Sequence, residues 1–262
     1  MLPTDLLPQS LATSASRRLF CFPHAGGGTA LYYRWQRHLP NDLVLAPMRL
    51  PGREDRIAEP PYSDLVTLAS DAAIAIRAAG NLPFALVGHS LGAYVALEVA
   101  LRLASDGGPL PAKLIVAACG APRIGKPTSP IGKLPDDEFI DQVAKRYDGI
   151  PAAVRNDAEL LAMVLPALRA DIQMIESYDY QPVDPLPIDL VALGGADDPG
   201  VAIHRLAQWR EHTTASFTMR LFPGGHFFLH PPARRAAPGE RESIPAPLAA
   251  ILEILPPNET TA

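Results

Sequence analysis

The chain has 262 residues, of which 48% are apolar and 19% are charged, a composition typical of globular proteins rather than disordered ones. Its 23 Lys and Arg stand against 28 Asp and Glu, and the resulting net charge of -5 offers no overall attraction for nucleic acid. This length is enough for one sizeable α/β domain. Proline is frequent, with 29 residues, so the sequence predicts many loops and few very long helices.

Neither a membrane span nor a secretion signal is indicated. No run of about 18 apolar residues occurs. The first 16 residues lack a basic start and a continuous apolar stretch, which argues against a signal peptide, so we expect a cytoplasmic protein. Cys21 and Cys119 lie at the ends of apolar runs without metal-ligand spacing. We therefore expect two buried, reduced thiols and no metal site.

Short apolar runs rich in β-forming residues recur at intervals too long for hairpins, and segments with helical periodicity lie between them. The expected strands are 19–22, 43–46, 84–87, 114–118, 189–193 and 217–222. The expected helices are 65–79, 91–104, 203–211 and 246–255. This alternation predicts an α/β fold with a mostly parallel, doubly wound sheet. No internal repeat is visible.

One interval breaks the alternation, because more than 60 residues separate the strand that ends at 118 from the strand that starts at 189. A helical face ends near Gly149, and Asn156 followed by Glu159 is typical of a capped second helix. That helix is expected to kink or to be replaced by a new helix at Pro166. We interpret residues 123–178 as a helical lid, residues 17–122 and 179–262 as the core, and residues 1–16 as a disordered segment. A helical decoration remote from chemistry is the alternative.

The strand 84–87 runs through Gly88-His89-Ser90-Leu91-Gly92 into a helical segment. This is G-x-S-x-G between a strand and a helix, the nucleophile elbow of serine hydrolases. Ser90 would stand on a strained turn, and residues without Cβ at 88 and 92 let strand and helix approach. The N–H of Leu91, at the start of the helix, can stabilise developing negative charge on a substrate oxygen.

A serine needs a histidine base and a carboxylate that orients it. Asp198 follows the strand 189–193 on a Gly-rich turn, and His226 follows the strand 217–222 and a Gly-Gly pair. Ser90, Asp198 and His226 are thus in the chain order of α/β-hydrolases. We favour His226 over His230, which lies further from the strand. We favour Asp198 over Asp197 on turn position alone.

The strand 19–22 leads into Pro23-His24-Ala25-Gly26-Gly27-Gly28, which resembles the H-G-G-G loop of esterases and lipases. Glycines let such a loop lie close under a substrate carbonyl. We therefore place the N–H of Ala25 beside that of Leu91 in an oxyanion hole. The loop lacks the glycine spacing of phosphate-binding motifs.

The chain resembles the type II thioesterases that accompany polyketide synthases and nonribosomal peptide synthetases. The resemblance covers nearly the whole chain from residue 19 to residue 255, although the Pro-rich tail after His226 and the first 16 residues depart from the family pattern. It rests on FCFPHAGGG (20–28), RLPGREDRIAEPP (49–61), VGHSLGAYVALE (87–98), LPDDEFI (134–140), the GGADDP turn and FPGGHFFL (222–229).

The resemblance implies an α/β-hydrolase fold and hydrolysis of acyl groups from the phosphopantetheine thiol of acyl or peptidyl carrier domains. Ser90 would be the nucleophile, His226 the base and Asp198 its orienter. No cofactor of the enzyme's own is expected, and the expected partners are carrier domains and small acyl thioesters, with the enzyme a monomer. Medium-chain release from a fatty acid synthase, a carboxylesterase or lipase with the same triad, and a noncatalytic binding module are the alternatives.

Two further sets of residues are candidates for substrate and carrier binding. Met163 and Met174 are candidates for an adaptable apolar lining of an acyl pocket beneath the lid, or for ordinary lid packing. An acidic carrier would need a local basic patch on this acidic chain. We favour Arg234, Arg235 and Arg241, over two other basic patches, Arg123 with Lys126 and Lys145 with Arg146. Solvated surface charge is the alternative for each group.

Overall fold

The computed structural model describes residues 2–8, 15–123, 129–147, 150, 152–230 and 243–255. The strands are β1 (Arg17–Phe22), β2 (Leu43–Pro47), β3 (Phe84–His89), β4 (Lys113–Ala117), β5 (Asp189–Gly195) and β6 (Phe217–Phe222). The α-helices are α1 (Ala30–Tyr33), α2 (Leu65–Ala78), α3 (Leu91–Ser105), α4 (Asp136–Tyr147), α5 (Ala152–Arg155), α6 (Ala158–Ser177), α7 (Ile203–Ala207) and α8 (Ala246–Ile254). Short 3-10 helices are η1 (Pro3–Leu6), η2 (Trp35–His38), η3 (Glu54–Arg56) and η4 (Gln208–His212).

All six strands pair in parallel in the order β2-β1-β3-β4-β5-β6. The predicted doubly wound parallel sheet is therefore confirmed. The chain steps from β1 outward to β2 and then returns past β1 to β3, so the direction of winding reverses between β1 and β3. Ligands of open α/β sheets bind at the carboxyl ends of the strands at such a switch point. The loop after β1 and the turn after β3 therefore meet where a site is expected.

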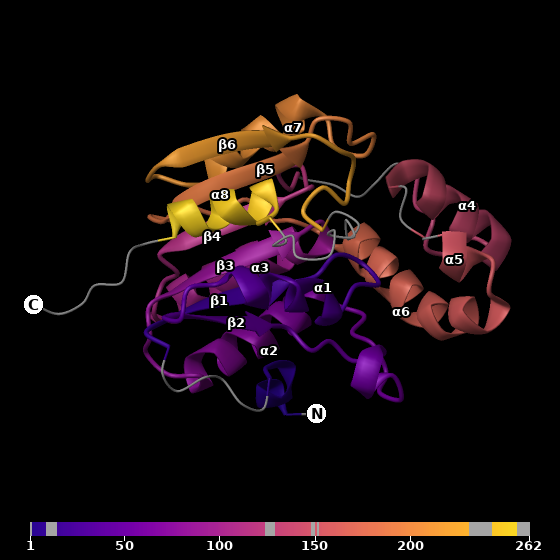
Figure 1. Cartoon of the computed structure of the whole chain (residues 1–262), viewed down its shortest axis with the longest axis horizontal. Coiled ribbons are helices and arrows are strands. Elements are labelled where there is room, and N and C mark those ends of the chain that lie inside the picture. The colour runs from indigo at the N-terminus through magenta and orange to yellow at the C-terminus, as the bar shows by residue number, and fades with distance from the viewer. Residues whose placement is uncertain are drawn as a thin grey trace, which may run out of the picture.

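Apart from the edge strand β6, whose residues are half-buried or exposed, the sheet is buried on both faces, which explains why its inner strands are continuous apolar runs rather than alternating ones. One face packs against α2 and α3 in a large core that includes Phe20, Leu86 and Trp209. The other face packs against α1, η2 and α8 through Leu19, Val87 and other side chains. Figure 1 shows these layers, with α8 and α2 on different sides of the sheet.

Helices α4, α5 and α6 stand together beside the sheet, apart from the helices that cover its faces (Figure 1). They have a small core of their own, which includes Phe139, Val143, Leu168 and Ile172. This is the helical part of the predicted insertion. Among the described residues, no helix is long and apolar enough to cross a membrane.

The cap of helix α6 differs from expectation, and of the two outcomes expected at Pro166 the start of a new helix is not seen. Its cap is Asp157 rather than Asn156, and the Asp157 carboxylate accepts the N–H groups of Glu159 and Leu160 at 3.0 and 3.1 Å. The helix also continues through Pro166 without ending. Pro166 and Ala162, whose carbonyl loses its helical donor there, are both exposed, so water can solvate that carbonyl.

The described part of the first 16 residues differs from the expected disordered segment. Residues 3–6 form η1, which packs against α2, and Leu6 is fully buried in the larger core. Burial of the Leu6 side chain in that core stabilises the short helix. Cys21 and Cys119 are buried free thiols, as predicted.

Candidate active site

Ser90 lies on a sharp turn between β3 and α3 and has a left-handed φ of 55°, which costs energy in a residue with a Cβ. Its N–H donates to the carbonyl of Ala117 on β4 at 2.8 Å, which holds the turn. A Cβ on Gly88 would overlap the first backbone turn of α3, and a Cβ on Gly92 would stand 2.8 Å from the Pro23 carbonyl oxygen. Both glycines are therefore required for the close approach, and Gly92 also lets the turn touch the loop after β1.

The structure brings Ser90, His226 and Asp198 together. The His226 Nε2 lies 3.0 Å from the Ser90 Oγ, and the His226 Nδ1 lies 2.9 Å from the Asp198 Oδ2. The His226 and Asp198 side chains are 3% and 1% exposed, so their contact is shielded from water. The other Asp198 oxygen, Oδ1, accepts the N–H of Gly200 at 2.8 Å, which fixes the rotation of the carboxylate.

The two rejected candidates lie elsewhere. Asp197 is exposed, and its carboxylate makes only a long contact of 3.4 Å with the N–H of Gly224. The ring of His230 stacks on Trp35 with centroids 5.3 Å apart, and burial lowers its pKa to about 3. His230 is therefore a neutral packing residue. Asp198, favoured for its position in the turn, and His226, favoured for its position after the strand, are thus the residues that lie beside Ser90.

The loop after β1 lies beside Ser90, and its orientation is fixed by hydrogen bonds. The His24 Nδ1 lies 2.9 Å from the Ala25 carbonyl oxygen, and the N–H of Gly27 donates to the His24 carbonyl at 2.9 Å. Burial lowers the pKa of His24 to about 4, so the ring is neutral at pH 7. Ala25 lines the same pocket as Ser90, and Leu91 is the first residue of α3.

The pocket at Ser90 is walled on one side by Val143 and Tyr147 of α4 and by Leu168, Ile172 and Ile175 of α6. Its free space is about 20 Å³, room for about one water molecule. The apolar walls therefore lie close together over Ser90 in this structure. Among the described residues, no group of three or more His, Cys, Asp or Glu side chains could hold a metal ion.

Comparison with known proteins decides the family. The model of the thioesterase domain family matches residues 17–236. The chain belongs to that family. The gramicidin S biosynthesis protein GrsT of Aneurinibacillus migulanus is 37% identical to this thioesterase over 218 residues, covering 83% of this chain and 85% of that protein. The thioesterase PikA5 of Streptomyces venezuelae is 36% identical over 222 residues, which cover 84% of this chain and 78% of PikA5.

A solved structure shows the same relationship. The type II thioesterase BorB from the borrelidin biosynthetic cluster superimposes with a TM-score of 0.76 at 37% identity, over 86% of this chain and 91% of that one. The enzyme is thus a thioester hydrolase with an α/β-hydrolase fold, akin to type II thioesterases of polyketide and nonribosomal peptide biosynthesis. The predicted fold class and family are confirmed.

The remaining candidates do not gather at the thioesterase pocket. Met163 is 53% exposed, and Met174 is 1% exposed within the larger core, so neither is among the residues that line the pocket. The apolar lining from α4 and α6 instead consists of branched aliphatic residues and Tyr147.

Most of the basic docking candidates cannot be placed. Arg234, Arg235 and Arg241 lie outside the described residues, as does Lys126. Arg123 and Lys145 are exposed, and Arg146 donates to the Ser129 carbonyl at 2.9 Å.

Sequence reasoning missed three charged residues behind the pocket: Arg53, Glu54 and Asp171. The PGRE stretch (51–54) indicates the family but does not by itself assign a role to Arg53 or Glu54. Asp171 interrupts the apolar face of α6 between Leu168 and Ile172. A lone carboxylate on a buried helix face requires a partner, and this was the available signal.

Proposed function

We propose that this thioesterase hydrolyses acyl groups from the phosphopantetheine arms of acyl or peptidyl carrier proteins through an acyl-enzyme on Ser90. The contacts of His226 with the Ser90 Oγ at 3.0 Å and with Asp198 at 2.9 Å, in an apolar pocket, support this proposal most directly. Relatives named for gramicidin S and borrelidin biosynthesis support the biosynthetic context.

In the first half-reaction, the Ser90 Oγ attacks the thioester carbonyl carbon while His226 Nε2 accepts the hydroxyl proton. Asp198 holds the proton on Nδ1, so that Nε2 presents a lone pair, and it stabilises the imidazolium. The N–H groups of Ala25 and Leu91 donate to the oxyanion. When the tetrahedral intermediate collapses, the C–S bond breaks and the departing thiolate takes the proton from His226.

In the second half-reaction, His226 takes a proton from water, and the resulting hydroxide adds to the serine ester. Collapse releases the carboxylic acid and returns the proton to the Ser90 oxygen. The apolar walls from α4 and α6 suit an acyl chain rather than a charged group. We propose that the helical insertion acts as a lid over the pocket and opens by movement of α4 relative to α6, since the free space beside Ser90 is small.

The test is hydrolysis of one acyl group presented on a carrier protein, on coenzyme A and as an oxygen ester. We expect kcat/KM to be highest for the carrier. Ser90→Ala should lower kcat by several orders of magnitude and abolish an acylated protein mass after brief mixing with substrate. Ser105→Ala, at the exposed far end of α3, is the matched control and should behave as wild type. A higher kcat/KM for the oxygen ester than for both thioesters would contradict the proposal.

A further inference from the structure

A buried ion pair joins α6 to the segment that follows β2. The Arg53 guanidinium donates to the two Asp171 carboxylate oxygens at 2.7 and 3.0 Å, and the side chains are 8% and 1% exposed. Both partners also bind the loop after β1: Arg53 donates to the Gly27 carbonyl at 3.0 Å, and Asp171 accepts the Gly26 N–H at 2.8 Å. The pair therefore has two contacts with the loop in addition to the ion pair itself.

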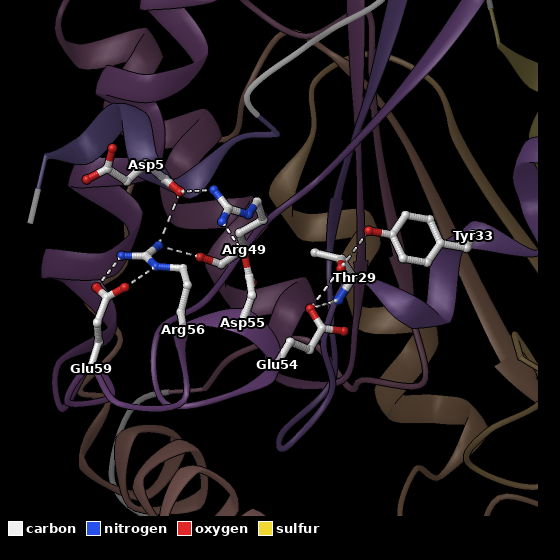
Figure 2. A network of polar contacts seen from close by, with 8 residues as sticks. All are labelled: Asp5, Thr29, Tyr33, Arg49, Glu54, Asp55, Arg56 and Glu59. Atoms are coloured by element: carbon white, nitrogen blue, oxygen red, sulfur yellow. Dashed lines mark hydrogen bonds and ion pairs between the residues drawn. The ribbon is translucent and has the colours of Figure 1, made fainter.

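The next residue of the same motif holds the other end of the loop. Glu54 accepts the N–H and hydroxyl of Thr29 at 3.0 and 2.7 Å and the N–H of Ala30 at 2.9 Å. Figure 2 shows its side chain directed at Thr29. Its backbone has a left-handed φ of 51°, which is strained for a residue with a Cβ. Two consecutive residues, Arg53 and Glu54, thus hold the segment from Gly27 to Ala30 at its two ends.

These contacts bear on the N–H of Ala25. That N–H belongs to the peptide plane whose carbonyl, from His24, accepts the N–H of Gly27. The Gly27 carbonyl is in turn bound by Arg53. The following peptide plane is held on both sides, since the Ala25 carbonyl meets His24 Nδ1 and the Gly26 N–H meets Asp171. Both peptide planes that flank Ala25 are therefore held in position.

Stability alone is a weak reason for such a pair, because desolvation can cancel the attraction between buried charges. Catalysis gives a stronger reason, since an oxyanion donor must be aimed before the charge develops. We propose that Arg53 and Asp171 are positioning residues that aim the Ala25 N–H at the substrate oxyanion, which rests on the proposed acyl-enzyme chemistry. Because Asp171 lies one residue from Ile172 of the pocket wall, α6 is the fixed wall of the pocket and the loop is set against it.

The test compares stability with chemistry in matched variants. Arg53→Met and Asp171→Leu leave one buried charge each, whereas the double variant leaves none. We expect each single variant to lower Tm and the double variant to recover most of it. The double variant should still have a kcat at least tenfold below wild type with KM within threefold, because the Gly26 N–H and the Gly27 carbonyl stay without partners. The control variant, Lys113→Met with Asp189→Leu, removes an ion pair between the first residues of β4 and β5, at the edge of the sheet opposite to Ser90. It should leave kcat unchanged.

A second readout does not depend on the natural substrate. An alkyl fluorophosphonate labels the nucleophilic serine and places its phosphoryl oxygen in the oxyanion hole, so its labelling rate should fall at least tenfold in the double variant. Asp171→Asn keeps the shape and one acceptor oxygen, so it should fold and show a smaller fall. If the labelling rate and kcat return together with Tm in the double variant, the pair is purely structural and the inference is wrong. If wild type reacts with the fluorophosphonate but hydrolyses no thioester, the proposed function fails instead.

Discussion

Replacing Asp198 by asparagine tests the orientation of the base with almost no change in shape. In the wild type, Asp198 Oδ1 accepts the Gly200 N–H and Oδ2 faces His226 Nδ1. In Asp198→Asn, the amide oxygen must stay with the Gly200 N–H, because the NH₂ group cannot accept it. The NH₂ group then donates to Nδ1, which moves the ring proton to Nε2. His226 can no longer accept the proton of Ser90.

The size of the effect follows from burial. The His226–Asp198 contact is 2.9 Å long and nearly inaccessible to water, so no solvent replaces the lost carboxylate. In serine hydrolases this change lowers kcat by about 10,000-fold. We expect about 1,000- to 10,000-fold here, or about 4 to 5.5 kcal/mol. Asp197→Asn should lower kcat less than about threefold, because the exposed Asp197 makes only a 3.4 Å contact.

The assay is steady-state hydrolysis of a soluble acyl thioester with colorimetric detection of the released thiol. Both variants should be compared with wild type for Tm, so that a loss of folding is not mistaken for a loss of catalysis. An equal loss of kcat in Asp197→Asn and Asp198→Asn, or a larger loss in Asp197→Asn, would refute the reasoning from the turn.

Three further outcomes are expected. Gly28→Ala should lower both Tm and kcat, since its Cβ would stand 2.5 Å from the Glu54 carboxylate; wild-type values would show that the loop yields freely. The buried His24 and His230, with pKa values of about 4 and 3 against 6.5 when unfolded, stay neutral while the unfolded chain binds protons as pH falls below 6.5. The free energy of unfolding in urea should therefore be about 2 kcal/mol lower per histidine at pH 5 than at pH 7, and His230→Phe should lose less than wild type. By hydrogen exchange, amides of α6 near Asp171 should be protected longer than those of α4, and the reverse order would argue against an anchored α6.

The sequence determined the parallel sheet, the family and the three residues at the centre of the site. Short apolar runs separated by intervals too long for hairpins, with helical segments between them, are typical of a buried parallel sheet, and each candidate follows such a run. Because parallel strands end at one edge, Ser90, Asp198 and His226 could be predicted to meet without coordinates.

Tertiary structure alone decided the walls and the supports of the site. Whether Met163 and Met174 reach the pocket depends on the rotation of α6, and apolar periodicity gives the buried face without saying which neighbour it meets. The partnership of Arg53 with Asp171 joins residues 118 positions apart, and no local rule relates them. A charged residue on a buried helix face indicates that a partner is needed. Only the packing of α6 against the loop after β1 shows which residue that partner is.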